Sequence, residues 1–192
     1  MSMQQMLFGF NAVSGGNTYA TLDPSNKGTN ATLSSGNLNL VSSSGYSSAR
    51  STISKTSGKW YWECTVTSPS SNMFGGVAQS TSNLNSYAGI DAVSWGFDYE
   101  NPTFYKWYNS GATALNNPTP LVTGDVIGFA LDMGGGTLQV YVNNISQGNH
   151  AGITGTVFAQ GSTNSTGSNL YNFGATAFTY SPPATYNSGL YT

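Results

Sequence analysis

The sequence predicts an all-β fold, an antiparallel sandwich of two packed sheets. Short runs that alternate between apolar and polar residues recur along the 192 residues, and Gly, Asn and Ser bound them. Aromatic residues, which favour strands, make up 13% of the chain. Almost no stretch of eleven residues has its apolar residues at helical spacing. A barrel is the alternative that this pattern leaves open.

The best-defined strand is predicted at residues 59–66. Its alternate positions are apolar, and they are Trp60, Trp62, Cys64 and Val66. Because successive side chains of a strand point to opposite faces, these four share one side. We therefore expect a half-buried strand with its tryptophans inside.

A hairpin is predicted directly after residue 124. Residues 125–133 and 137–143 alternate in the same way, and glycines 134–136 separate them. Three glycines supply the positive φ of a hairpin connection, so the two strands should pair antiparallel. A second turn is predicted at Asn143-Asn144, because asparagine tolerates left-handed backbone better than most residues.

Charge and cysteine content argue against several classes of function. Charged residues make up 6% of the chain and the net charge is −2, so no basic surface is available for nucleic acid. Cys64 is the single cysteine and His150 the single histidine, which rules out a four-ligand Cys/His zinc site. We expect His150 in a solvated loop, no cofactor, no metal and no membrane insertion.

The chain is expected to be one sandwich domain that follows a short arm. Residues 1–20 carry no charge and include the apolar side chains Met6, Leu7, Phe8 and Phe10. Such an arm docks on a neighbouring subunit or covers an edge of its own domain, and both alternatives stay open. The β-sandwich domain is predicted for residues 21–192.

Five blocks of sequence follow one another at characteristic spacings. They are Gly58-Lys-Trp-Tyr-Trp-Glu63, Ser94-Trp-Gly96, Gly124-Asp-Val-Ile-Gly128 with Ala130-Leu-Asp132, Gly136-Thr-Leu-Gln-Val-Tyr141, and Asn172-Phe-Gly174 with Phe178-Thr-Tyr-Ser-Pro-Pro183. In order and spacing they resemble the SPRY domain family over about residues 20–192. One departure is Asn143-Asn144, where the family usually has Asn-Gly. The resemblance implies a bent antiparallel β-sandwich, a concanavalin-like jelly roll, that recognises partners through loops on one face and has no catalytic machinery.

The binding surface is predicted at the segment 95–108, where seven aromatics occur within fourteen residues, together with the polar Asn109 that follows it. Aromatic faces with nearby acidic and amide groups suit sugar rings and protein hot spots equally well. The predicted ligand-binding residues are Trp95, Phe97, Asp98, Tyr99, Glu100, Phe104, Tyr105, Trp107, Tyr108 and Asn109. A pair of core strands is the alternative, because Trp95, Phe97 and Tyr99 share the same parity.

An acidic pair in this segment raises the possibility of an enzyme. Asp98 and Glu100 stand two residues apart, and glycosidases need two carboxyl groups about 5 to 10 Å apart. Nothing in the sequence raises the pKa of either group, and no partner motif accompanies them. We therefore expect no enzyme, and keep a polysaccharide-degrading sandwich enzyme as the last alternative.

The chain is similar to SPRY domains of bacteriophage particles in its low charge, its abundant Gly, Ser, Thr and Asn, and its uncharged arm. This likeness implies a non-catalytic structural protein on the virion surface, decorating the capsid or the tail. The arm would bind other virion proteins in a homo-oligomer or larger assembly, and the loop face would contact a glycan or protein of the host surface. The alternative is an intracellular adaptor for protein–protein interaction.

Overall fold

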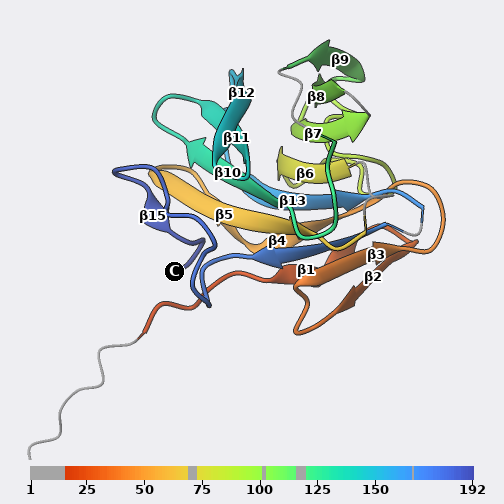
Figure 1. Ribbon diagram of the computed structural model, residues 1–192, viewed down its shortest axis with the longest axis horizontal. Coiled ribbons are helices and arrows are strands. Elements are labelled where there is room, and N and C mark those ends of the chain that lie inside the picture. Colours follow the sequence, from red (N-terminus) through yellow and green to blue (C-terminus); the bar gives the residue numbers. More distant parts are fainter. Residues whose placement is uncertain (1–15, 69–72, 101–102, 116–119, 166) are drawn as a thin grey trace, which may run out of the picture.

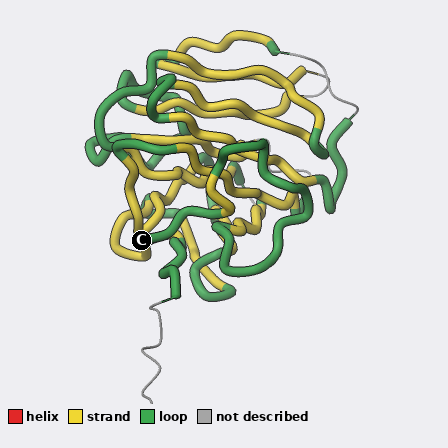
Figure 2. Tube along the Cα trace, turned by 90° about the vertical axis from the view of Figure 1, so that its left-hand side faces the viewer, coloured by secondary structure: helices red, strands yellow, loops and turns green. Residues whose placement is uncertain are grey.

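The computed structural model describes residues 16–68, 73–100, 103–115, 120–165 and 167–192. Its strands form two sheets that stack face to face, and no helix occurs in these ranges (Figures 1 and 2). It follows that none of the described residues belongs to an apolar helix of membrane-spanning length. The predicted all-β antiparallel sandwich is confirmed.

Both sheets are antiparallel along their whole spatial order. The seven-stranded sheet contains, in that order, β1 (Leu22–Lys27), β4 (Ser47–Lys55), β13 (Val157–Thr163), β6 (Met73–Ala78), β7 (Ser94–Glu100), β8 (Thr103–Tyr108) and β9 (Gly111–Ala114). The eight-stranded sheet contains β12 (Ile145–Ala151), β11 (Thr137–Val142), β10 (Val126–Asp132), β5 (Lys59–Val66), β14 (Ser168–Asn172), β3 (Asn39–Ser42) and β2 (Ala31–Ser34), and β15 (Asn187–Ser188) pairs with β5 in parallel.

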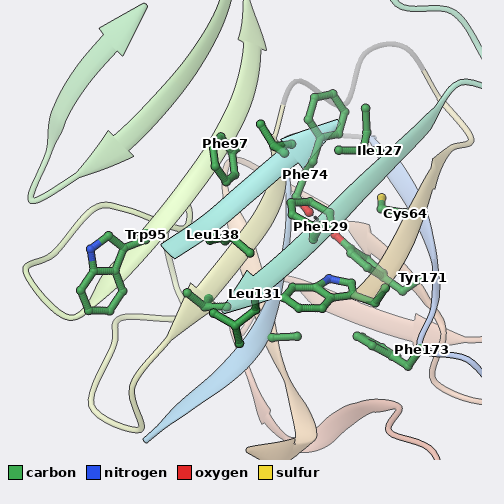
Figure 3. Close-up of a cluster of buried hydrophobic side chains, with 14 of the residues drawn as sticks. Cys64, Phe74, Trp95, Phe97, Ile127, Phe129, Leu131, Leu138, Tyr171 and Phe173 are labelled. Carbon is green, nitrogen blue, oxygen red and sulfur yellow. Dashed lines mark hydrogen bonds between the residues drawn. The ribbon is translucent and has the colours of Figure 1, made fainter. Parts of the chain in front are cut away.

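The hydrophobic core lies between the two sheets, and aromatic side chains from both fill it (Figure 3). Phe97 of β7 contacts Phe129 of β10 across the interface, with ring centroids 6.2 Å apart. Tyr171 of β14 donates a hydrogen bond of 2.8 Å from its hydroxyl to the backbone oxygen of Phe74 in β6. These contacts fix the inner face of β7, and therefore also decide which side chains of β7 face outward.

Strand β5 has the predicted bounds, but it is buried on both faces. Trp62 is 1% exposed on the inner face, as expected, while Glu63 on the opposite face is only 2% exposed. Residues 176–183 cover that face, where Phe178 packs edge-on against Tyr61 with ring centroids 5.1 Å apart. The expectation of a half-buried strand is therefore wrong, because a segment more than 110 residues later covers the second face.

The predicted hairpin of β10 and β11 is confirmed, with Asp132 opposite Thr137 at its end. Only Gly136 of the three turn glycines has a positive φ, so the expectation for Gly134 and Gly135 is wrong. The backbone N–H groups of those two glycines donate to Asp132 Oδ1, both at 3.0 Å. A side-chain acceptor thus shapes the turn that glycine flexibility was expected to shape.

The turn at Asn143-Asn144, which joins β11 to β12, is also confirmed. Both residues have a positive φ, of 47° and 67°, as a two-residue hairpin turn requires. Asn143 Nδ2 donates to Asp125 Oδ1 at 2.8 Å, and Asn143 Oδ1 accepts the Val126 backbone N–H at 2.9 Å. The first asparagine therefore ties the turn to the start of β10.

His150 lies in β12 and is 4% exposed, which corrects its predicted place in a solvated loop. Burial lowers the pKa of the imidazole to about 4, so the ring is neutral at pH 7. Its Nε2 is 2.9 Å from the Gly96 backbone oxygen, to which a neutral ring can donate. His150 thus links the two sheets and performs a structural role.

The two ends of the described chain lie side by side. Tyr19 forms an antiparallel bridge with Tyr191, and the Ala20 N–H donates to the Leu190 oxygen at 2.7 Å. Residues 18–20, which were assigned to the arm, therefore pair with the C-terminal segment. The rest of the expected assembly arm, with Met6, Leu7, Phe8 and Phe10, falls outside the described residues.

Candidate functional site

The predicted binding segment forms the antiparallel hairpin of β7 and β8, and its aromatic residues divide between two faces. The inner face carries four of the ten predicted residues, each no more than 7% exposed, namely Trp95, Phe97, Tyr99 and Phe104. These four side chains belong to the core and not to a loop surface. The core-strand alternative therefore describes half of the segment.

The outer face carries the polar half of the same hairpin. Asp98 and Glu100 share this face of β7, and Tyr105 stands directly opposite Asp98 on β8. Trp107 stands opposite Gly96 on the same face. The structure thus brings together four of the predicted residues.

Tyr108 and Asn109 lie apart from the outer face. Asn109 has a φ of 50° and begins the tight turn into β9. Tyr108 is 44% exposed and stacks on Trp95 with ring centroids 5.5 Å apart. It also lines a hollow of about 490 Å³ beside β8 and β9. We call this hollow the β8–β9 groove, and its lining residues are Trp95, Lys106, Tyr108, Gly111, Ala112, Thr113, His150, Ala151 and Gly152.

The loop between β6 and β7, residues 79–93, packs down on the outer face of the hairpin. A Cβ atom on Gly96 would lie 1.9 Å from the Ala88 backbone oxygen, so glycine is needed for this close approach. The Ala88 N–H donates to Ser162 Oγ at 3.0 Å, and Asp91 Oδ1 accepts the Ser94 hydroxyl at 2.6 Å. These bonds hold the loop against the sheet.

This loop and a second one each bring a tyrosine to the outer face. Tyr87 of the 79–93 loop packs edge-on against Trp107, with ring centroids 5.1 Å apart. Tyr46 precedes β4 and packs edge-on against Tyr87 at the same distance. The neighbouring Gly45 N–H donates to Ser165 Oγ at 2.8 Å, which fixes the second loop.

Together these residues enclose a small cavity of about 130 Å³. Its lining consists of three aromatic and two acidic side chains, namely Tyr46, Tyr87, Trp107, Asp98 and Glu100, and we call it the aromatic–acidic cavity. Tyr46 is 41% exposed and Glu100 is exposed, so the cavity opens to the surface. Asp98, at 3% exposure, forms its buried end.

The buried end of the cavity carries polar atoms without a partner. Asp98 Oδ1 and the Trp107 Nε1–H are both buried, and neither makes a hydrogen bond of normal length and angle with a described residue. Burial raises the pKa of the Asp98 carboxyl to about 7, the nearby Trp107 indole opposes this change, and the Glu100 carboxylate adds to it. A buried acceptor left unbonded costs about 1 to 3 kcal/mol, so its retention points to a role other than stability.

The polar groups of the β8–β9 groove, by contrast, bond within the protein. Lys106 Nζ donates to the Asn149 backbone oxygen at 3.0 Å, and His150 bonds to the Gly96 oxygen. None of the buried unpartnered atoms found in the described ranges lines this groove. The β8–β9 groove therefore offers a ligand fewer unbonded polar groups than the aromatic–acidic cavity does.

Sequence reasoning missed Tyr46 and Tyr87. Each stands in a loop rich in Ser, Asn and Gly, where no periodic pattern assigns a side chain to a face. The hydrogen bonds that position them join residues far apart in the sequence, such as Gly45 to Ser165. The sequence shows only that a tyrosine stands between Gly45 and Ser47, and this does not indicate that its ring lies near Trp107.

The described residues offer no cluster of three or more His, Cys, Asp or Glu that could hold a metal ion. Cys64 is a free thiol in the core, and burial raises its pKa above the ordinary range. The arrangement on the outer face can therefore bind a group through aromatic faces, two carboxyls and an indole N–H.

The chain is similar in sequence to one protein family and in fold to several solved structures. The family model of the SPRY domain matches residues 59–168. No curated protein sequence matches the chain. Three similar solved structures are the SPRY domain of human HERC1 (TM-score 0.64, 15% identity, 78% of this chain and 96% of that one), the PSpry domain of TRIM65 (0.63, 16%, 81% and 90%) and stonustoxin (0.61, 23%, 81% and 27%).

At these identities the solved structures show the shared fold alone. The family model, however, covers more than half of the 192 residues and includes strands β5 to β13. Three of the five blocks noted in the sequence lie wholly inside that match, namely Ser94-Trp-Gly96, Gly124-Asp-Val-Ile-Gly128 with Ala130-Leu-Asp132, and Gly136-Thr-Leu-Gln-Val-Tyr141. The chain belongs to the SPRY domain family.

Proposed function

We propose that the chain is a non-catalytic protein-recognition domain that binds its partner on the outer face of the β7–β8 hairpin. The observation that carries this proposal is the aromatic–acidic cavity, a surface opening with buried polar atoms that lack partners. Tyrosine, tryptophan and charged anchors in small desolvated pockets are typical of the residues that dominate protein–protein binding energy. A single projecting side chain of a partner suits such a pocket.

The shape of the cavity favours a protein side chain over a whole small molecule. Its volume of about 130 Å³ lies below the roughly 300–1,000 Å³ of typical small-molecule sites. A sugar ring or an oligosaccharide substrate would therefore remain largely outside. This limit also weighs against the polysaccharide-degrading alternative, although Asp98 has the raised pKa that a general acid needs.

Loop order supports recognition without large rearrangement. Ser48 Oγ donates to the Ser86 backbone oxygen at 2.6 Å, and the Ser48 N–H donates to the Leu84 oxygen at 2.9 Å. Both bonds tie the loop that carries Tyr87 to strand β4. A binding surface that is ordered before the partner arrives loses less conformational entropy on association.

The biological setting is a separate part of the proposal. A virion surface protein would use this face toward a host protein or glycan and the N-terminal arm toward other virion proteins. An intracellular adaptor would use the same face toward a peptide segment, and the family membership supports this general protein-binding role more directly. Immunogold microscopy of particles distinguishes the settings, because label on head or tail supports the first and unlabelled particles support the second.

Selection of binding peptides from a random display library tests the recognition function. Peptides that bind the full chain should bind the Tyr46→Ala variant at least tenfold more weakly, because Tyr46 is an exposed wall of the cavity. Tyr108→Ala is the matched control, since Tyr108 has nearly the same exposure, 44% against 41%, but lines the other hollow. Equal losses in both variants, or failure to select any peptide, would contradict the proposal.

A further inference from the structure

We propose that the aromatic–acidic cavity binds the ammonium group of a lysine side chain presented by a partner protein. This inference rests on the proposed recognition function and specifies the ligand chemistry of the same cavity. Three aromatic rings and two carboxyl groups surround one small space. Aromatic faces attract cations, and carboxylates add both charge and hydrogen-bond acceptors.

The buried end of the cavity holds an unpartnered acceptor, Asp98 Oδ1, beside an unpartnered donor, the Trp107 Nε1–H. Asp98 is 3% exposed, and its Oδ1 has no partner among the described residues. An ammonium N–H that enters between the rings would supply that donor and the compensating positive charge together. A neutral ligand would supply at most the first of the two.

The cation must come from another molecule. The chain has five Lys and Arg residues, all of them described, and each is engaged elsewhere. They are Lys27 with the Ala31 oxygen, Arg50 with the Gln79 oxygen, Lys55 with the Tyr191 oxygen, Lys59 with Asp132, and Lys106 with the Asn149 oxygen. Charge complementarity therefore selects a cationic partner for the two carboxyl groups of the cavity.

Size and geometry favour lysine over larger cations. A volume of about 130 Å³ holds a compact ammonium head on an alkyl chain. The unpartnered group at the buried end is one oxygen, Asp98 Oδ1, which suits a single ammonium N–H, whereas the planar fork of a guanidinium matches both oxygens of a carboxylate at once. A fully methylated ammonium keeps its charge but has no N–H to donate to Asp98. The ligand is therefore an ammonium that retains at least one N–H.

The charged and titratable groups around Asp98 should make lysine binding depend on pH. The titratable groups that face Asp98 are Glu100 of the same strand, Tyr105 of β8, Tyr46 and Tyr87. Burial raises the pKa of Tyr46, and the charges of the two carboxyls raise it further. Asp98 titrates near pH 7, whereas lysine keeps its charge well above that. Binding should therefore strengthen as the pH rises from 6 to 8.

A titration of the full ¹⁵N-labelled chain with capped lysine, Nα-acetyl-lysine methylamide, tests the inference directly. The Trp107 indole N–H and the Tyr46 and Tyr87 amide resonances should shift saturably, with weak millimolar affinity. The Nε-acetylated probe, which lacks the charge, should leave them unchanged, and the trimethylated and arginine probes should bind several-fold more weakly than lysine. Tighter binding of the acetylated, trimethylated or arginine probe, or no shift with lysine, would overturn the inference.

Two charge variants complete the test. Asp98→Asn preserves size and should weaken lysine binding about tenfold, and Glu100→Gln should weaken it by less because Glu100 is exposed. Tyr108→Ala, in the β8–β9 groove, should leave it unchanged. Unchanged affinity in Asp98→Asn would overturn the inference, and a fold check by heteronuclear spectra separates this result from misfolding.

The outcomes also separate this inference from the proposed function. If library peptides bind through Tyr46 but replacing their lysines with glutamine has no effect, the lysine inference fails and the recognition function stands. If capped lysine binds in the cavity but no library peptide is selected, the cation site stands and recognition of peptide segments fails. Enrichment of lysine among the selected peptides supports both.

Discussion

Two buried carboxyl groups, one on the outer face of each sheet, have opposite surroundings. Glu63 of β5 is 2% exposed, and its oxygens accept the Thr179 and Tyr180 N–H groups at 2.8 and 2.9 Å. The Tyr61 hydroxyl donates to it as well, at 3.1 Å. Asp98 of β7 is 3% exposed, and its Oδ1 has no partner in the described parts of the chain.

The difference separates scaffold from site. Glu63 uses its acceptors to fasten residues 176–183 over the eight-stranded sheet, so its burial is compensated by bonds within the chain. The loop 79–93 covers Asp98 in a similar way but leaves one oxygen unbonded beside a cavity. Burial alone therefore does not separate the two carboxyls, whereas the unpartnered oxygen beside a cavity singles out Asp98.

The largest effect on stability is expected at Glu63. Replacing Glu63 with Ala removes the acceptor of two backbone N–H groups and of the Tyr61 hydroxyl, which should lower the free energy of unfolding by about 3 kcal/mol. Glu63→Gln keeps one oxygen acceptor and should lose less. Urea denaturation measures both variants, and limited proteolysis should cut Glu63→Ala within residues 176–186. Native protection of that segment in the variant would argue against the fastening role.

A pH-dependent effect is expected at Asp98. The folded-state pKa of about 7 lies above the ordinary value near 3.9, so the folded protein binds more protons between these limits and its stability falls as the pH rises from about 4 to 7. His150 acts in the opposite direction, because burial lowers its pKa from 6.5 to about 4, and its contribution rises with pH over that range. Asp98→Asn should remove only the first trend.

Urea denaturation at pH 5 and pH 8 measures this difference. One pKa unit corresponds to about 1.4 kcal/mol, so Asp98→Asn should gain on the order of 3 kcal/mol relative to the wild type between the two pH values. The same variant should bind lysine about tenfold more weakly, which would make Asp98 a residue that lowers stability and supports function. If the two proteins change in parallel with pH, Asp98 does not titrate near pH 7.

A smaller loss is expected from Gly96→Ala. The added Cβ would lie 1.9 Å from the Ala88 backbone oxygen, so the loop 79–93 must move away from the sheet. Such overpacking costs about 1 to 3 kcal/mol and should displace Tyr87 from Trp107, which the indole resonance of Trp107 would report. Gly134→Ala is the control, since its nearest contact is an ordinary 3.4 Å. Unchanged stability and an unchanged Trp107 resonance would show that the loop does not depend on this approach.

The sequence predicts the strands better than it predicts the segments that pack over them. Alternation identifies β5, β10 and β11 to within one residue, because a two-residue period records which side chains meet the core. It does not reveal that residues 176–183 bury the second face of β5, since that contact depends on a carboxylate bonding to backbone N–H groups that carry no sequence signal. His150 was misplaced for the same reason, because its partner is a backbone oxygen of β7.

The candidate site could be predicted only in part. The aromatic density of residues 95–109 indicates the correct hairpin. Once the strand is known, the alternation of side chains places Phe97 and Asp98 on opposite faces. Tyr46 and Tyr87 reach the cavity through loops, and their positions depend on hydrogen bonds such as Gly45 N–H to Ser165 Oγ. Loop conformation of this kind follows from tertiary contacts, which local patterns do not encode.

The smallest effect is expected from Glu100→Gln, and it tests why Asp98 is perturbed. Glu100 is exposed, so the substitution should change stability by no more than about 0.5 kcal/mol. Burial is the main cause of the raised Asp98 pKa and the Glu100 charge a minor one, so a carboxyl titration by NMR should find that the Asp98 pKa falls only slightly. A return of Asp98 to the ordinary range would mean that repulsion between two carboxylates causes the shift. In that case a bound cation would act mainly by neutralising the pair, and the hydrogen bond to Asp98 Oδ1 would lose its importance for selecting lysine.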